Sequence, residues 1–280
     1  MITISVKDSA GALLAKATHK DEALLRIDRE YQPGDTIVIE SDTAHLWVQM
    51  DMTLLPGEVY LPSGTMTWPI PEGEHRLAYC PVAFQGSRHT VTARAMTDAE
   101  VSARRNIARN PSDLRGNTDF YPHCTANVET RGESCFAARN VIDGMHHSAY
   151  HGEWSFQSWG IGAREDAWCL LNFGHEVTID QMTLTLRADF PHDAYWVNGH
   201  VVLSDGAEVA YDPEKTGNRQ YIPLGTHTVR WMRLERMQKS NEPSASRLSL
   251  NGKCSGVGDG GWESREALPP CTHRLRANGP

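Results

Sequence analysis

Alternation of apolar and polar residues is the feature that most limits how this chain can fold. In residues 45–54, one face carries Leu46, Val48, Met50, Met52 and Leu54. Successive side chains of a β-strand point to opposite faces of a sheet, so a period of two is typical of a half-buried strand. The same alternation returns at 179–187, in IDQMTLTLR. We therefore expect a protein built mainly of strands.

Short apolar runs separated by turn residues extend this pattern over most of the chain. Besides the N-terminal residues, we expect strands at 36–40, 58–61, 89–95, 167–173, 200–204, 207–211 and 229–235. Pro33-Gly34-Asp35, Pro56-Gly57 and Ser204-Asp205-Gly206 lie between such runs and are typical of turns. Many short strands at this spacing favour antiparallel sandwiches. The sequence therefore predicts an all-β protein with two antiparallel β-sandwich domains.

Two segments without alternation divide the chain. Residues 97–117 are charged and end near Asn110-Pro111-Ser112-Asp113, which predicts a helical or extended linker. The arginines of this segment form either a solvated face or ion pairs with the adjoining domains. After Gly252 the chain is rich in glycine and proline. We expect a small immunoglobulin-like sandwich at 1–96, a second sandwich at 118–252 and a Gly/Pro-rich tail at 253–280.

Charge and apolar content exclude several classes of partner. The chain of 280 residues has 27 Lys and Arg against 35 Asp and Glu, a net charge of −8, which disfavours binding to a phosphate backbone. No run approaches the roughly 20 apolar residues that span a bilayer, and the N-terminus lacks the pattern of a signal peptide. We therefore expect a cytoplasmic protein with reduced cysteines and no nucleic-acid or membrane partner. A homo-oligomer stays open.

Residues 118–252 resemble a known family. The runs that carry the resemblance are CFAARNVIDG (135–144), SWGIGAREDAWCLLNFGHEVTIDQMTLTLRADF (158–190) and the late RWMRLERM. They resemble the discoidin-like C domain of coagulation factors 5 and 8, whose bacterial relatives are the family-32 carbohydrate-binding modules with a galactose-binding-like fold. The resemblance implies an eight-stranded jelly roll that binds glycans or other polar ligands with loops at one end.

The resemblance also implies one cofactor, a structural calcium near the Asp-Gly turn, to which Asn140 and Asp143 would contribute. Met145-His146-His147 stand where the family usually has a threonine, and the usual late acidic residue is missing from 247–252. No other cofactor is expected.

A loop rich in histidine and tryptophan follows this turn and is the first candidate ligand site. It contains His147, His151, Trp154 and Trp159. A sugar needs a flat aromatic face for its C–H side and rigid polar groups for its hydroxyls, and this loop supplies both. The alternative is that Trp154 and Trp159 cap the sandwich core while the histidines are solvated. The spacing of the histidines does not favour a zinc site.

The second candidate is the segment 186–196, LRADFPHDAYW, at the end of a predicted strand. Arg187 and His192 would hold a carboxylate or vicinal hydroxyls, and Asp193 would accept a hydroxyl proton. The alternative is an ion pair between Arg187 and Asp189 that closes the sandwich end. His123 is a third candidate, because the family topology brings its segment close to the ligand loops.

Three functions follow from these residues, and the first is favoured. In the first, the protein would bind a carbohydrate through these residues: His123, His147, His151, Trp154, Trp159, Arg187, Asp189, His192 and Asp193. Alternatively, it is a carbohydrate-active enzyme, a lyase or a glycoside-acting one. His192 or His151 would then be the general acid or base, with Arg187 stabilising negative charge and Asp189 and Asp193 as the carboxylate pair of a glycosidase. The third reading is a structural or partner-binding protein.

Overall fold

Two four-stranded antiparallel sheets form the first sandwich of this computed structural model, which describes residues 1–146, 152–187, 195–241 and 252–256. One sheet has the order β2 (Leu13–His19), β1 (Ile2–Lys7), β4 (Thr36–Ser41) and β7 (Thr65–Pro69). The other has the order β3 (Glu22–Ile27), β8 (His89–Ala95), β5 (His45–Gln49) and β6 (Gly57–Tyr60). Ile4, Ile39 and Trp68 from the first sheet pack against Leu46 and Val91 from the second.

The predicted apolar face at 45–54 ends sooner than its sequence pattern suggests. Leu46, Val48 and Met50 are buried, but Met52 is 72 % exposed. The carboxylate of Asp51 accepts hydrogen bonds from the backbone N–H and the hydroxyl of Thr53, at 2.9 and 2.7 Å. This local turn ends the strand. The Asp51 side chain bonds the backbone N–H two residues ahead, which takes the place of a hydrogen bond to a neighbouring strand.

A six-stranded antiparallel sheet wraps around itself to form the second sandwich. Its order is β12 (Glu208–Tyr211), β11 (Trp196–Leu203), β13 (Arg219–Lys239), β10 (Cys169–Leu186) and β14 (Gly252–Gly256), and β9 (His123–Ala126) also pairs with β10. The register between β10 and β13 is interrupted between Asn172 and Val177. Such interruptions bend a strand. The two strands predicted at 167–173 and 179–187 are therefore one long strand.

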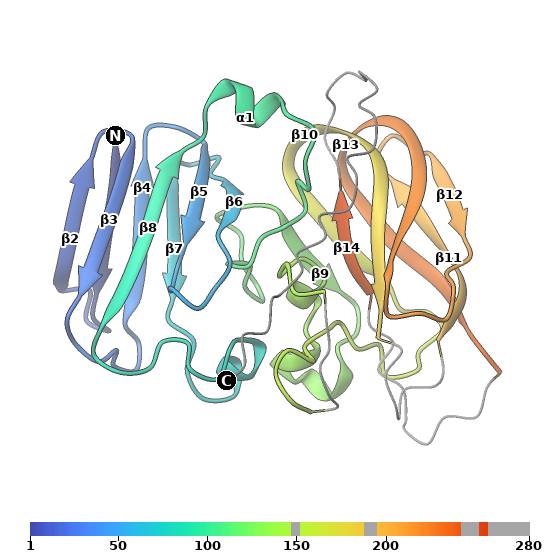
Figure 1. Ribbon diagram of the computed structural model, residues 1–280, viewed down its shortest axis with the longest axis horizontal. Coiled ribbons are helices and arrows are strands. Elements are labelled where there is room, and N and C mark those ends of the chain that lie inside the picture. The colour runs from blue at the N-terminus through green and yellow to red at the C-terminus, as the bar shows by residue number, and fades with distance from the viewer. Residues whose placement is uncertain (147–151, 188–194, 242–251, 257–280) are drawn as a thin grey trace, which may run out of the picture.

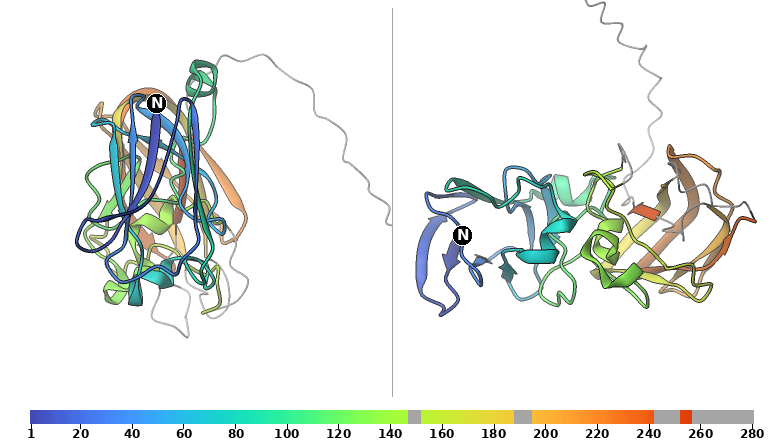
Figure 2. Two further views of the ribbon diagram at one scale, coloured as in Figure 1. Left: turned by 90° about the vertical axis from the view of Figure 1, so that its left-hand side faces the viewer. Right: turned by 90° about the horizontal axis from the view of Figure 1, so that it is seen from below.

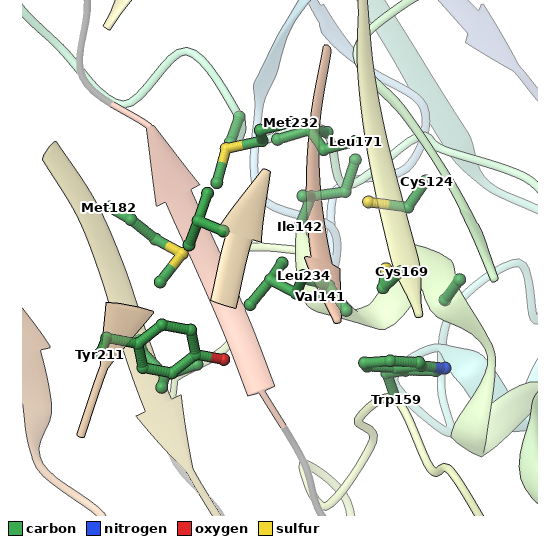
Figure 3. Close-up of a cluster of buried hydrophobic side chains, with 14 of the residues drawn as sticks. Cys124, Val141, Ile142, Trp159, Cys169, Leu171, Met182, Tyr211, Met232 and Leu234 are labelled. Atoms are coloured by element: carbon green, nitrogen blue, oxygen red, sulfur yellow. The ribbon is translucent and has the colours of Figure 1, made fainter. Parts of the chain in front are cut away.

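Both halves of β10 face the same core. Figure 3 shows Leu171, from the first half, and Met182, from the second, among one set of buried side chains. β9 pairs with the first half and β14 with the second. The bend thus folds the sheet over its own apolar face, and the prediction of an all-β protein with two antiparallel sandwiches is confirmed.

Short helical turns occupy the region between the two sandwiches, as Figures 1 and 2 show. They are η1 (Gly73–Ala78), α1 (Asp98–Ser102), η2 (Thr130–Gly132), η3 (Ser134–Phe136) and η4 (Ala138–Val141). Phe120 is fully buried in the core of the first sandwich. The division at 96, 117 and 252 stays a prediction.

One contact between the sandwiches is built around Arg139, and we call it the Arg139 joint. The guanidinium of Arg139, in η4, donates to the carbonyls of Pro111 and Asp113 at 2.6 Å and of Ala78 at 3.3 Å. The carboxylate of Asp113 in turn accepts a hydrogen bond from His123 at 2.7 Å. Residues from η1, the connecting segment and the second sandwich therefore meet at one buried cation.

A second contact is a group of rings, and we call it the ring joint. Tyr60 and His175 have ring centroids 4.2 Å apart, and His45 lies 5.2 Å from His175. Arg105, from the connecting segment, forms a two-pronged ion pair with Glu58 at 2.6 and 2.7 Å. Arg104 pairs with Asp180 at 3.0 Å. These two arginines thus form the ion pairs that the sequence left open for this segment.

Two further expectations concern the whole chain. None of the helices in the described residues is long and apolar enough to cross a membrane. Cys80, Cys135 and Cys169 are free thiols.

Candidate binding site

Arg187, which begins the second predicted segment after the end of its strand, contacts the first predicted loop. This residue follows β10 directly and is only 5 % exposed. Its guanidinium lies 5.5 Å from the centroid of the Phe156 ring and donates to the Phe156 carbonyl at 3.4 Å. A guanidinium over an aromatic ring is an attractive contact. It fixes the loop 152–159 to the end of β10.

A second aromatic ring extends this contact toward the surface. Phe136, in η3, lies edge-on to Phe156 with ring centroids 6.2 Å apart. The exposed Arg131 places its guanidinium 5.3 Å from the centroid of Phe136. Two arginines and two phenylalanines therefore form one continuous row of contacts at this end of the second sandwich. Sequence reasoning missed Phe136 and Phe156, although Phe156 stands in the predicted His/Trp loop.

The two tryptophans of the loop lie in different surroundings. Trp159 is 2 % exposed, belongs to the core of the second sandwich and donates from Nε1 to the Val128 carbonyl at 2.8 Å. It leaves no ring face for a ligand, which favours the alternative that it caps the core. Trp154 is half-buried and lines a small pocket together with Leu55 and Met145. Trp154 is thus the tryptophan of this loop that a ligand can reach.

His123 lies away from the surface, in β9. It is 7 % exposed, and its Nδ1 donates to the carboxylate of Asp113, which also accepts from the backbone N–H of Cys124 at 2.9 Å. Burial lowers the pKa of His123, but the hydrogen bond to Asp113 and its negative charge raise it more, so the pKa lies above its ordinary value. These contacts give His123 a structural partner and keep it from a ligand.

The residues proposed for calcium do not fit a cation. The side-chain oxygen of Asn140 accepts a hydrogen bond from Arg139 at 2.9 Å, and its amide donates to the Ser134 carbonyl at 2.9 Å. Asp143 accepts from the backbone N–H of Met145 at 2.8 Å. A guanidinium at the oxygen of Asn140 repels a divalent cation, and calcium needs six or more oxygen ligands. The described residues therefore offer no calcium site built on Asn140 and Asp143.

Five of the predicted site residues lie outside the described residues: His147, His151, Asp189, His192 and Asp193. Within the described ranges, no group of three or more histidine, cysteine, aspartate or glutamate side chains could hold a metal ion. The part of the site that the structure describes is therefore aromatic and cationic, with Arg187, Phe156 and Trp154 as its main residues.

No family model and no curated protein matches the sequence. Among solved structures, the chain is similar to chitosan-binding module 1 of a chitosanase/glucanase from Paenibacillus sp. IK-5, with 16 % identity and a TM-score of 0.35, covering 56 % of this chain and 99 % of that one. It is also similar to a family-32 carbohydrate-binding module of Clostridium perfringens in complex with GlcNAc-α-1,4-galactose, with 13 % identity and a TM-score of 0.39, covering 56 % and 95 %.

A third similar structure is discoidin II from Dictyostelium discoideum, with 9 % identity and a TM-score of 0.37, covering 49 % of this chain and 54 % of that one. Discoidin and the family-32 carbohydrate-binding modules are also the proteins that residues 118–252 resemble in sequence. At such identities and scores we take from them no argument about ligand or activity.

Proposed function

We propose that this protein binds carbohydrate at the end of the second sandwich, where the loop 152–159 meets the end of β10. The observation that carries the proposal is the stacking of Arg187 on Phe156 at 5.5 Å, two residues along the loop from the half-buried Trp154. A sugar ring presents an apolar C–H face that packs on an aromatic ring, and its hydroxyls need polar groups held in place. The proposal agrees with the family resemblance of residues 118–252.

Arg187 has a positioning role in this proposal. It is almost fully buried, so its contact with the Phe156 carbonyl orders the loop that carries Trp154. A preordered loop loses less conformational entropy when a ligand binds. The rings of Trp154 and Phe156 would then supply the aromatic faces. The proposed hydroxyl contacts are the residues that flank these loops in the sequence: His147, His151, Asp189, His192 and Asp193.

The test is ligand-observed NMR on the purified chain with a panel of neutral and uronic-acid oligosaccharides. We expect saturation transfer to at least one oligosaccharide. Trp154→Ala and Phe156→Ala should each weaken its binding by about 1–3 kcal/mol, the scale of a lost aromatic contact. Trp231→Ala is the matched control, because Trp231 is also half-buried but lies within β13. It should leave the affinity unchanged.

Two outcomes would contradict the proposal. If no oligosaccharide shows transfer, the protein is not a carbohydrate binder. If the three variants bind alike, the ligand occupies another surface.

The same tubes test the enzyme alternative. A spectrum recorded after a day should show no new anomeric or unsaturated-sugar signals if the protein only binds its ligand. New anomeric signals would indicate hydrolysis, and unsaturated-sugar signals would indicate elimination. Either result would replace the binding proposal with a carbohydrate-active enzyme.

A further inference from the structure

A cavity of about 330 Å³ lies between the two sandwiches, beside η1. Pro69, Ile70 and Pro71, which end β7 and follow it, form one wall, and Leu114 and Ala137 form the other. Pockets for small molecules are typically of at least ~300 Å³, mostly apolar, with few polar groups. This cavity has both properties. Its lining does not include Arg187 or Phe156, but Ala78, Tyr79 and Arg139 also line the small pocket beside Trp154.

The inner wall of this cavity includes a buried cation without a carboxylate partner. Arg139 lines the cavity and is 5 % exposed. Its hydrogen bonds go to three backbone carbonyls and to the amide oxygen of Asn140, all of them neutral. No carboxylate in the described part of the chain forms an ion pair with it, and the carboxylate of Asp113 is bonded to His123 instead.

An unpaired charge in the interior is unfavourable, so buried cations are usually matched by an anion. Neutral carbonyls solvate the guanidinium of Arg139 but do not cancel its charge. The pKa of the neighbouring Tyr79, whose ring lies 4.6 Å from this guanidinium, is raised by burial, so its phenol stays neutral. The buried carboxylates of Asp113 and Asp143 also act on Tyr79 through their charge, so this region already holds negative charge. An anionic group that entered the cavity would add a direct partner for Arg139.

The rim of the cavity holds its polar groups in fixed positions. The hydroxyl of Ser134 donates to Glu74 at 2.7 Å and lies 3.2 Å from Nδ1 of His75. Arg115 pairs with Glu129 and donates to the Gly132 carbonyl at 3.1 Å. The exposed Glu72 also lines the rim and disfavours an anion near it. The favourable place for a negative charge is therefore the inner wall, at Arg139.

We propose that this cavity binds a small organic carboxylate with an apolar ring, the ring against Pro69, Ile70 and Leu114 and the carboxylate toward Arg139. An apolar ring gains from the burial that these walls offer. The carboxylate gains from a guanidinium in a site where water screens little. A neutral molecule of the same shape gains only the first of these contributions.

The experiment compares benzoate with benzamide, which has the same shape but no charge. In saturation-transfer NMR at equal concentration, benzoate should bind at least tenfold more tightly than benzamide, and acetate, which lacks the ring, should show no binding. Equal affinity for benzoate and benzamide, or no transfer to benzoate, would overturn the proposal. Neither result depends on a variant that has to fold.

A matched pair of variants places the ligand. Leu114→Trp fills the cavity and should reduce benzoate binding at least tenfold. Leu24→Trp makes the same change on β3 at an exposed position far from the cavity lining and should bind benzoate as the wild type does. If Leu114→Trp binds benzoate like Leu24→Trp, benzoate occupies another place and the proposal is wrong.

Discussion

The Arg139 joint and the ring joint hold the same two sandwiches together with the same kinds of groups, yet they differ in how the charges meet. In the Arg139 joint, the carboxylate of Asp113 bonds the histidine, His123, and the arginine is left with neutral oxygens. In the ring joint, the carboxylate of Glu58 bonds the arginine, Arg105, and also lies 3.7 Å from Nδ1 of His45. His175 contacts the rings and donates from Nδ1 to the Phe173 carbonyl at 2.9 Å. A histidine favours its charged form where the carboxylate of the joint bonds that histidine, as Asp113 bonds His123. It does not where the carboxylate bonds the arginine instead.

This difference appears in the two histidine pKa values. The pKa of His123 is raised by Asp113 in spite of burial. The pKa of His175 is lowered, first by burial and further by the charges of His45 and Arg105. Ionisable groups at an interface therefore do not act alike, because a direct carboxylate partner reverses the effect of burial.

The largest effect should come from removing the guanidinium at the centre of the Arg139 joint. Arg139→Met leaves four buried oxygens without their donor, which should lower the free energy of unfolding by about 3–5 kcal/mol. Urea unfolding measures this change. Arg131→Met is the control, because Arg131 is exposed and its ion pair with Glu133 and its contact with the Phe136 ring both lie at the surface side of the residue. It should stay within about 0.5 kcal/mol of the wild type. If the two variants lose the same free energy of unfolding, the buried hydrogen bonds of Arg139 add no more stability than the contacts of the exposed Arg131.

The next effect concerns the carboxylate that bonds His123. Asp113→Asn keeps the shape but removes the charge that accepts from His123 and from the Cys124 N–H. We expect a loss of about 2 kcal/mol in the free energy of unfolding. An NMR titration should also show the pKa of His123 falling below its ordinary value, because burial then acts without the opposing charge. An unchanged pKa of His123 would show that Asp113 does not set it.

The corresponding change in the ring joint should cost less. Glu58→Gln removes the two-pronged ion pair with Arg105, whose side chain is 20 % exposed. Because water reaches this pair, we expect a loss of about 1 kcal/mol in urea unfolding. Asp180→Asn breaks the more exposed pair with Arg104 and should change the free energy by less than about 0.5 kcal/mol. If Glu58→Gln costs as much as Arg139→Met, the two joints are not different in strength.

Much of the fold was predictable because its strands bury one face. The segment 89–95 alternates strictly and forms β8 with the predicted bounds. β2 was missed because it lies at a sheet edge and none of its residues is buried, with Leu13 57 % exposed, so its sequence has no buried face to show. The single bent strand β10 was predicted as two, since the bend interrupts the period without ending the strand.

The candidate site was less predictable than the fold. The sequence pointed to Arg187 and Trp154, but the contact of Arg187 with Phe156 depends on which strand ends lie together, and no local pattern carries that information. Arg139 was missed altogether. Its partners are mainly backbone carbonyls from two distant segments, and every residue type has such a carbonyl.

The smallest effect is the pH dependence of the two joints, and its sign separates them. His123 has a raised pKa, so its contribution to stability is complete below the unfolded value of about 6.5 and is lost as the pH rises through its folded pKa. His175 has a lowered pKa, so its contribution is present above about 6.5 and is lost as the pH falls through its folded pKa. The measurement is the free energy of unfolding in urea for His123→Gln and His175→Gln between about pH 5 and 8, each compared with the wild type. The difference from wild type should change with pH in opposite directions for the two variants.

This range lies above the titration of Glu58, whose pKa is held below 4.5 by His45 and Arg105 in spite of burial. Slopes of the same sign would mean that the carboxylate partner does not determine how each joint responds to protons.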